Sequence, residues 1–529
     1  MTELGISSLP MLYRLDLLPP ELNSFFFIQS LFTLASISYL FLIFIKEKFV
    51  LGRLYYVLSA FICIFYQIPL TLFSQQVEHS LSNPWYFALT INGAILILTA
   101  WGRITKNIRT HQSMSEFPAN IASIYVTTGL IGILCIIFYF YNIPWSCTGL
   151  YAILNDPWLT LLAREFNVKL VGSSLSTYAI GANANAISPI FILLSFWIVI
   201  TSAKRKNIIG IIIGTVCGFA AVISVIITGT KGLLMPSLLM LAAGSYFWTR
   251  TWINRILAIS ASVMFVVVAI FTFEMFKDRG ASTSGSYDFA SCSAKAGTCE
   301  QSQALLKSLH HVDYALGVPP YMLKQMEKRL SCLCSGKENL SCPDAALTSG
   351  NIHNLNAGIS VPQRTVMNYA TSILYRVFVT PLQVAVWHFM YAETENVDGF
   401  KTLPLSNKIY GESLNMPELV YQKYASVFFE GDRTATSTSP TSFLLTYSSY
   451  LGVTGFLLSM ILVIGTDLFL LIISMMLERS LFPVLVGLIA ILSMNFIVSD
   501  FLTVLISHGG AAGICMIIFY TILKKQRGT

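Results

Sequence analysis

Charged residues are scarce in this chain of 529 residues, of which 11% are Asp, Glu, Lys or Arg and 55% are hydrophobic. Globular proteins carry roughly 25% charged residues. The deficit excludes an ordinary soluble domain and indicates an integral membrane protein. The net charge of +7 does not indicate nucleic-acid binding, because the cations lie mostly in short loops between apolar runs.

Several catalytic motifs are also missing. The chain contains neither GxxxxGK[ST] nor HExxH, which argues against a P-loop ATPase and a zincin protease. It has no Asp-x-Asp pair, and the nearest pattern is Glu-Thr-Glu at 393–395. We therefore expect no metal and no other cofactor. The apolar runs hold few carboxylates, Glu274 and Asp467, and the chain has no evident internal repeat, which counts against a proton-coupled transporter.

Long apolar runs dominate what is present. No short apolar core with a basic flank and a small-residue cleavage site precedes the first run, so we expect no cleaved signal peptide. Runs of spanning length fall at 24–45, 51–74, 86–102, 121–141, 177–202, 207–228, 231–248, 252–276, 443–466, 481–498 and 502–523.

The connections between these runs alternate sharply in charge. One set is basic, whereas in the alternate set the segments 75–85 and 499–501 contain no Lys or Arg. Since positive loops stay cytoplasmic, we expect the N-terminus outside, the C-terminus inside and 277–442 outside. The basic set comprises Lys46, Lys48, Arg53, Arg103, Lys106, Arg109, Lys204, Arg205, Lys206, Arg250, Arg255, Arg479, Lys524, Lys525 and Arg527.

The stretch "LYRVFVTPLQVAVWHFMY" at 374–391 is apolar enough to resemble a twelfth span. If it crossed the membrane, every later loop would contradict the charge bias. We therefore expect a segment that is re-entrant or lies along the outer surface. Pro381 in its middle favours a broken helix.

These patterns predict an all-α polytopic membrane protein with about 11–12 transmembrane helices. Residues 1–276 form an N-terminal bundle of about eight spans, and 443–529 form a C-terminal bundle of about three. Between them, 277–442 is a large extracytoplasmic loop. It consists of a Cys-rich cap at 277–370 and the re-entrant or interfacial helix at 371–391.

Ten cysteines divide between the two environments. Four lie inside apolar runs, and six lie in outward segments, where an even number indicates disulfides in an oxidising compartment. Zinc is the alternative for the second set, but the Cys-x-Cys spacing at 332–334 is not the usual CxxC. The candidate disulfide cysteines are Cys147, Cys292, Cys299, Cys332, Cys334 and Cys342.

Cations stand beside apolar surface at several outward places. Arg164 lies in "LAREF", Lys231 in "TGTKGLLMP", Arg376 in "LYRVF" and Arg433 in "EGDRT". Cations at headgroup level suit a phosphate or diphosphate, to which Arg offers forked donors and Lys a point charge. The alternative for each of these cations is snorkelling or pairing with a nearby carboxylate. This alternative is strongest for Arg433 and weakest for Arg376.

His388 is the preferred candidate for a general base, because histidine side chains ordinarily change protonation near physiological pH. A histidine satisfied by interfacial water is the alternative. Glu393, Glu395, Glu412 and Glu430 are rival bases that the sequence does not rank. In an ideal helix, Arg376, Thr380, Gln383 and Trp387 share one face, from which His388 is rotated by roughly 120°.

Four stretches together resemble the Wzy-type polysaccharide polymerases, which join lipid-linked O-antigen or capsule repeat units. They are the Arg-containing loop leading into "GSSLSTYAIG", the "TGTKGLLMPSLLML" turn, "YRVFVTPLQVAVWHF" and "TSPTSFLLTYSSYLGVTGFL", covering about residues 155–470. The family's turn often reads Gly-Ser-Arg-Gly, and Lys231 here replaces that Arg. Attraction for phosphate survives this change, but bidentate geometry does not.

The resemblance implies a GT-C-like glycosyltransferase of the bacterial inner membrane that acts on the periplasmic side without a nucleotide sugar. Its substrates would be undecaprenyl-pyrophosphate-linked glycans, and a chain-length regulator would be its protein partner. Arg164, Arg376 and His388 would then be catalytic, and Arg164, Lys231, Arg376 and Arg433 would hold the pyrophosphate. Trp387, Tyr391 and Glu412 would contact the glycan. The rival functions are an O-antigen ligase, a flippase or transporter, and a scaffold protein.

Overall fold

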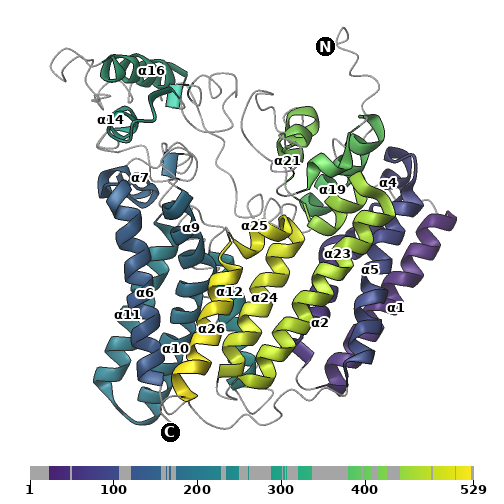
Figure 1. The fold of residues 1–529 in the computed structure, drawn as a ribbon, viewed down its shortest axis with the longest axis horizontal. Coiled ribbons are helices and arrows are strands. Elements are labelled where there is room, and N and C mark those ends of the chain that lie inside the picture. Colours follow the sequence, from purple (N-terminus) through teal and green to yellow (C-terminus); the bar gives the residue numbers. More distant parts are fainter. Residues whose placement is uncertain are drawn as a thin grey trace.

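The computed structural model of this protein describes residues 23–47, 50–106, 121–155, 163, 166–167, 174–227, 234–248, 260, 288–300, 302–303, 306, 320–335, 379–395, 397–403, 406, 414–425, 441–477, 481–506 and 508–525. Every regular element in these residues is helical (Figure 1). Seven of the described helices are long and apolar enough to cross a membrane, and three shorter apolar helices accompany them. The prediction of an all-α, multi-pass membrane protein is confirmed.

In chain order the principal helices are α1 (Ser24–Lys46), α2 (Leu54–Ile62), η3 (Cys63–Gln67), α3 (Ile68–Leu72), α4 (Ser74–Ser80), α5 (Pro84–Ile104), α6 (Ile121–Asn142), α7 (Gly149–Asn155), α9 (Ser174–Ala182), η7 (Asn183–Ile187), α10 (Ser188–Lys204), α11 (Ile208–Ile226), α12 (Leu234–Trp248), α14 (Phe289–Lys295), α16 (Pro320–Cys334), α19 (Thr380–Thr394), η12 (Gly399–Thr402), α21 (Met416–Val420), η13 (Tyr421–Ala425), α23 (Phe443–Met476), α24 (Phe482–Val498), α25 (Phe501–Leu505) and α26 (Gly510–Lys525).

Every predicted span except 252–276 coincides with described helices, and of that run only residue 260 is described. One predicted span differs in shape. The run 502–523 is not a single helix, because α25 ends at Leu505 and α26 begins at Gly510. Gly509 lies between them with φ +70°, a left-handed conformation that ends one helix and lets the next begin.

Helix α24 lies at the centre of the bundle. It packs against α2, α12, α23 and α26, and it is buried without interruption from Phe482 to Ser493. The peripheral helices α1 and α11 instead expose large apolar side chains: Phe27 and Phe41 are each 61% exposed, and Ile209 is 71% exposed. Such surfaces face lipid rather than water, which fits a membrane bundle.

The bundle has two distinct ends in Figure 1. We call the end with α7, α19 and α25 the upper end, and the end with the α10–α11 turn the lower end. Basic residues gather at the lower end, where Lys106 pairs with Glu47 across 3.4 Å and the Nε of Arg103 donates to the Tyr39 hydroxyl over 2.8 Å. The turn from α10 to α11 adds Lys204, Arg205 and Lys206 there.

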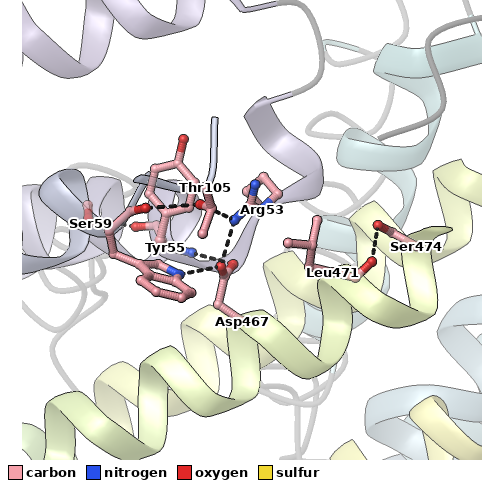
Figure 2. A network of polar contacts seen from close by, with 8 residues as sticks. Arg53, Tyr55, Ser59, Thr105, Asp467, Leu471 and Ser474 are labelled. Carbon is pink, nitrogen blue, oxygen red and sulfur yellow. Dashed lines mark hydrogen bonds and ion pairs between the residues drawn. The ribbon is translucent and has the colours of Figure 1, made fainter. Parts of the chain in front are cut away.

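A buried ion pair joins three helices (Figure 2). Arg53, just before α2, donates from Nη2 to Oδ2 of Asp467 in α23 over 2.9 Å, and their side chains are 8% and 1% exposed. The indole Nε1 of Trp101 in α5 donates to the same oxygen over 2.8 Å, and the backbone N of Tyr55 donates to Oδ1 over 3.2 Å. Arg53 also donates to Thr105 over 2.7 Å.

Small residues let α10 and α11 approach closely. A Cβ placed on Gly214 would lie 2.8 Å from Val199 Cγ2 and 3.0 Å from the Ser195 carbonyl oxygen. Gly218, one turn further along α11, faces Ser195 in the same way. Membrane helices pack through such small residues because close backbone approach increases dispersion contact where the hydrophobic effect gives no help.

Two spans contain a π-helical turn, and a proline follows each of them. The turn η3 precedes Pro69, and η7 precedes Pro189. Both turns bury polar side chains: Gln67 and Asn183 are each 0% exposed. Gln67 donates to Asn92 over 2.7 Å, and Asn183 donates to Ser224 over 3.2 Å. Side-chain hydrogen bonds inside the bundle thus give these two buried amides a partner.

Helices α14 and α16 lie above the upper end and are tied to it (Figure 1). A disulfide joins Cys147, which follows α6, to Cys292 in α14. A second disulfide joins Cys299 to Cys334 at the end of α16. Arg329 pairs with Asp288 over 2.6 Å and packs one helix against the other. Part of the predicted cap is therefore a small helical unit held by disulfides.

Candidate functional site

The predicted site residues divide into two groups. His388, Trp387 and Tyr391 belong to the described helix α19. A second group lies outside the described residues: Arg164, Lys231, Arg376, Arg433, Glu412 and Cys342. The remaining candidates are cysteines within the described residues. The site is therefore built here from α19 and the elements that contact it.

Helix α19 lies at the upper end of the bundle, beside the start of α23 (Figure 1). It also contacts α4, α21 and η3. Its 15 residues extend about 22 Å, which is less than the roughly 30 Å hydrocarbon core. The elements that follow α19 in the chain, α21 and the start of α23, also lie at the upper end. Helix α19 therefore does not carry the chain to the lower end.

The prediction of a helix broken at Pro381 stays a prediction, because the residues before Val379 lie outside the described part of the chain. Helix α19 runs without interruption from Thr380 to Thr394, and Pro381 lies in its first turn. A proline is well tolerated there because its missing N–H would have had no helical partner. All residues from Leu382 to Met390 are buried, so this part of α19 is packed on every side rather than lying on the surface.

His388 is 0% exposed. Its Nδ1 lies 3.0 Å from the hydroxyl of Tyr450 in α23, and the two rings meet edge to face with centroids 5.9 Å apart. The partner of this nitrogen is thus a protein hydroxyl rather than interfacial water. The contact fixes the orientation of the imidazole, which is what a positioned general base requires.

Tyr450 stands directly before a break in α23. Gly452 has φ +61° and ψ −140°, which is not helical. A Cβ on Gly399, at the start of η12, would collide with the carbonyl oxygen of Tyr450. The absence of a side chain at Gly399 thus lets η12 pack directly on the backbone beside the His388–Tyr450 contact.

Aromatic side chains and one cation fill the space between α19 and η13. The rings of Trp387 and Tyr424 are stacked at 14° with centroids 6.5 Å apart. Lys423 Nζ lies 5.2 Å from the ring centroid of Tyr391 and 5.4 Å from that of Tyr424. It also donates to Glu395 over 2.6 Å and to Thr394 over 2.8 Å.

These contacts shift two pKa values. Burial lowers the pKa of Lys423, but the hydrogen bond to Glu395 and the neighbouring Tyr424 outweigh it and raise the pKa above its usual value. Burial, and then the charge of Glu395, raises the pKa of Tyr391. Lys423 therefore stays charged, and its hydrogen bonds to Glu395 and Thr394 hold η13 against the end of α19.

Glu393 and Glu395, the two acids of the Glu-Thr-Glu pattern, have separate partners. Glu393 accepts from the backbone N–H groups of Ser82 and Asn83, over 3.1 and 3.4 Å, at the start of α5. Glu395 pairs with Lys423. No cluster of His, Cys, Asp or Glu that could hold a metal occurs among the described residues.

Five of the six candidate disulfide cysteines are described, and all five are disulfide-bonded. Cys147 pairs with Cys292 and Cys299 with Cys334, while Cys332 is bonded as well. The prediction of disulfides in the outward segments is confirmed for these residues. The two pairings themselves were left open by the sequence.

Sequence reasoning missed Tyr450 and Lys423. Tyr450 lies 62 residues after His388, and Lys423 lies 28 residues after Glu395. Residues this far apart in the sequence do not meet within one helix. Only the packing of α19 against α23 and η13 brings these partners together. The one local signal was Gly452, since glycine inside an apolar helical run often marks a kink.

Comparison with family models, with curated proteins and with solved structures gives no match for this chain.

Proposed function

We propose that the chain is a membrane polymerase that joins undecaprenyl-pyrophosphate-linked oligosaccharide repeat units into O-antigen or capsular polysaccharide. It is a nucleotide-independent glycosyltransferase with a GT-C-like bundle of about 11–12 transmembrane helices. It lies in the bacterial inner membrane with the upper end periplasmic, the N-terminus periplasmic and the C-terminus cytoplasmic. Membrane lipid and a chain-length regulator are its partners.

The distribution of charge and disulfides supports this orientation. Lys106, Arg103 and the basic turn after α10 gather at the lower end, as expected of a cytoplasmic surface. The disulfides Cys147–Cys292 and Cys299–Cys334 lie at the opposite end, which suits the oxidising periplasm. Helix α19 shares that end with the disulfides, so the chemistry would take place on the periplasmic side.

The single observation that carries the proposal is the buried His388–Tyr450 contact at the upper end of the bundle. Burying a histidine costs free energy unless the ring is hydrogen-bonded, and the Tyr450 hydroxyl both meets this need and orients the imidazole. It lies on the same helix as Tyr391, which meets Tyr424 edge to face and is only partly buried, and aromatic rings are common in sugar-binding sites.

In the proposed reaction, His388 takes the proton of the acceptor sugar's hydroxyl. The hydroxyl oxygen forms a bond to the donor's anomeric carbon, and the bond from that carbon to the diphosphate oxygen breaks with inversion. Arg164, Lys231, Arg376 and Arg433 would hold the diphosphate and stabilise the charge that grows on it. The lipid diphosphate leaves with both electrons of the broken bond.

The test is complementation of a deletion strain with His388→Ala or Arg376→Ala, read as polysaccharide ladder length at equal protein level. His79→Ala is the matched control, because His79 is exposed on α4. We expect short or absent ladders from the first two variants and full ladders from the control. Full ladders from both His388→Ala and Arg376→Ala would overturn the assignments.

The deletion strain itself separates the proposal from its rivals. A polymerase deletion leaves lipid A core carrying a single repeat unit. A ligase deletion leaves no attached repeat at all. A flippase deletion leaves the lipid-linked repeat unit on the cytoplasmic face, where a periplasmic hydrolase does not reach it.

A further inference from the structure

Helix α26 begins inside the protein rather than at its surface. Gly509 and Gly510 are both buried, and a Cβ on Gly509 would lie 2.6 Å from Ala182 Cα at the end of α9. A Cβ on Gly510 would lie 2.8 Å from both Leu492 Cδ2 and the Val504 carbonyl oxygen. The start of this 16-residue helix is therefore enclosed by α9, α24 and α25.

Three backbone donors in the first turn of α26 have no acceptor among the described residues. The first helical hydrogen bond runs from Gly513 N to Gly509 O, 2.9 Å, so the N–H groups of Gly510, Ala511 and Ala512 have no helical acceptor. Gly509 stands at the cap position and supplies no side-chain oxygen. Nothing in the described part of the chain accepts from these three groups. A buried helix start needs such acceptors, and an anion meets the need best.

Asn495 provides an independent sign of a ligand. It is 8% exposed, and its Nδ2 is buried without a hydrogen-bond partner among the described residues. Leu492 of α24 contacts Gly510, and Asn495 lies three residues further along the same helix face. Asn495 therefore lies on the side of α24 that faces the start of α26, about one turn nearer the upper end.

His508 adds a second unused side-chain group at the same place. Its Nδ1 is buried without a hydrogen-bond partner in the described structure, although its own backbone N–H donates to Thr503 O over 2.8 Å. It precedes α26 by two residues. Leaving such groups unpaired costs free energy, so a partner absent from the protein is expected.

The nearest acid in sequence is occupied by other groups. Asp500 accepts from the Tyr447 hydroxyl over 2.8 Å and from the backbone N–H of Leu502 over 2.9 Å. Its carboxylate caps α25, so its hydrogen-bonding capacity is used away from α26. The start of α26 thus offers backbone N–H donors and the Asn495 amide, and His508 adds a third donor in the tautomer that carries its proton on Nδ1.

We propose that the start of α26, together with Asn495 and His508, binds the diphosphate of a lipid-linked glycan. This inference rests on the proposed function for the nature of the lipid, while the oxyanion chemistry follows from the donors alone. The site lies at the upper end of α24, where α25 and α26 stop short of the longer α23 (Figure 1). A lipid headgroup entering from the outer leaflet would meet it at that depth.

The experiment uses the full chain in phosphatidylcholine nanodiscs and measures equilibrium binding of radiolabelled farnesyl diphosphate, with empty nanodiscs subtracted. Inorganic diphosphate and farnesol serve as competitors. The variants are Asn495→Leu and His508→Gln, which lie on different elements. His79→Gln is the matched control, and size-exclusion profiles and thermal unfolding check that each variant folds.

We expect farnesyl diphosphate to bind, farnesol not to compete, and each of the two variants to bind about tenfold more weakly, as the loss of one charge-assisted hydrogen bond implies. The control should bind like the wild type. Wild-type affinity in both variants, or no binding to the wild-type protein, would refute the site. If inorganic diphosphate binds as tightly as farnesyl diphosphate, the site takes the free anion and the lipid-linked assignment is wrong.

A second readout separates this inference from the proposed function. If His388→Ala abolishes polymer while Asn495→Leu keeps both full ladders and full binding, the site is wrong and the function stands. If Asn495→Leu loses binding while every variant, including His388→Ala, keeps full ladders, the site stands and the proposed function is wrong.

Discussion

The ion pair between Arg53 and Asp467 provides the sharpest prediction from this structure (Figure 2). Asp467 is 1% exposed and accepts from Arg53, from Trp101 and from the backbone of Tyr55. Replacing Asp467 by Leu removes the acceptor and leaves the guanidinium buried without its counter-charge. Breaking a buried pair in this way costs about 3–5 kcal/mol, so we expect Asp467→Leu to lower the free energy of unfolding by that amount.

The double variant tests whether the charge itself causes the loss. In Arg53→Met with Asp467→Leu no charge stays buried, so the double variant should recover most of the stability that either single change removes. The assay is reversible unfolding of the purified protein in mixed micelles by increasing sodium dodecyl sulfate. It is arranged as a double-mutant cycle.

The exposed pair of Lys106 and Glu47 is the control for this cycle. Its side chains are 61% and 31% exposed, so Lys106→Met should change the free energy of unfolding by less than about 1 kcal/mol. The reasoning fails if Asp467→Leu costs no more than this control. It fails equally if the two single changes at the buried pair add in the double variant, since additivity means that the charges do not interact.

Three further predictions follow from particular contacts. Gly214→Leu should destabilise the bundle by more than about 2 kcal/mol, measured by the same unfolding assay, because the side chain would meet Val199 and the backbone of Ser195; Gly465→Leu, with open space around it, should not. Burial alone would raise the pKa of Asp288, but hydrogen bonds from Arg329 and Ser291 outweigh it and lower the pKa below its usual value. The stability this gives the α14–α16 unit is present above the unfolded-state pKa and is lost as pH falls through the lowered one. Protection factors of the α14 amides, corrected for the intrinsic pH dependence of exchange, should therefore fall on acidification in the wild type and change much less in Asp288→Asn. Tyr450→Phe removes the hydroxyl that meets His388 and should shorten polysaccharide ladders at unchanged protein level, whereas ladders of wild-type length would contradict the positioning role of Tyr450.

The spans were predictable because bilayer thickness imposes a length on any apolar run, whatever its partners. The Gly-rich face of α11 was readable for a related reason, since the spacing of Gly210, Gly214 and Gly218 places them on one helix face. The π-helical turns were not predictable. Their stability depends on amides such as Gln67 meeting Asn92 on another helix, and sequence spacing carries no record of that contact.

The candidate site was predictable only in part, for a similar reason. His388 stood out as a polar residue in an apolar run, and its place near the upper end followed from counting loop charges. Its burial and its partner did not follow, because they depend on how α23 bends at Gly452. The sequence did not show that Pro381 lies in the first turn of α19, because nothing in the apolar run marks Thr380 as the start of a helix.

The length of α23 connects the two ends of the molecule. Its 34 residues would extend about 51 Å as one straight helix, well beyond the roughly 30 Å hydrocarbon core. The part after Gly452, about 24 residues or 36 Å, suffices to cross, and Asp467 anchors it near the lower end. The part before Gly452 is then surplus to the crossing and is free to turn toward α19, where Tyr450 meets His388. A helix of ordinary spanning length would end before reaching this histidine, so the break at Gly452 lets one segment both cross the membrane and hold the polar contact at its upper surface.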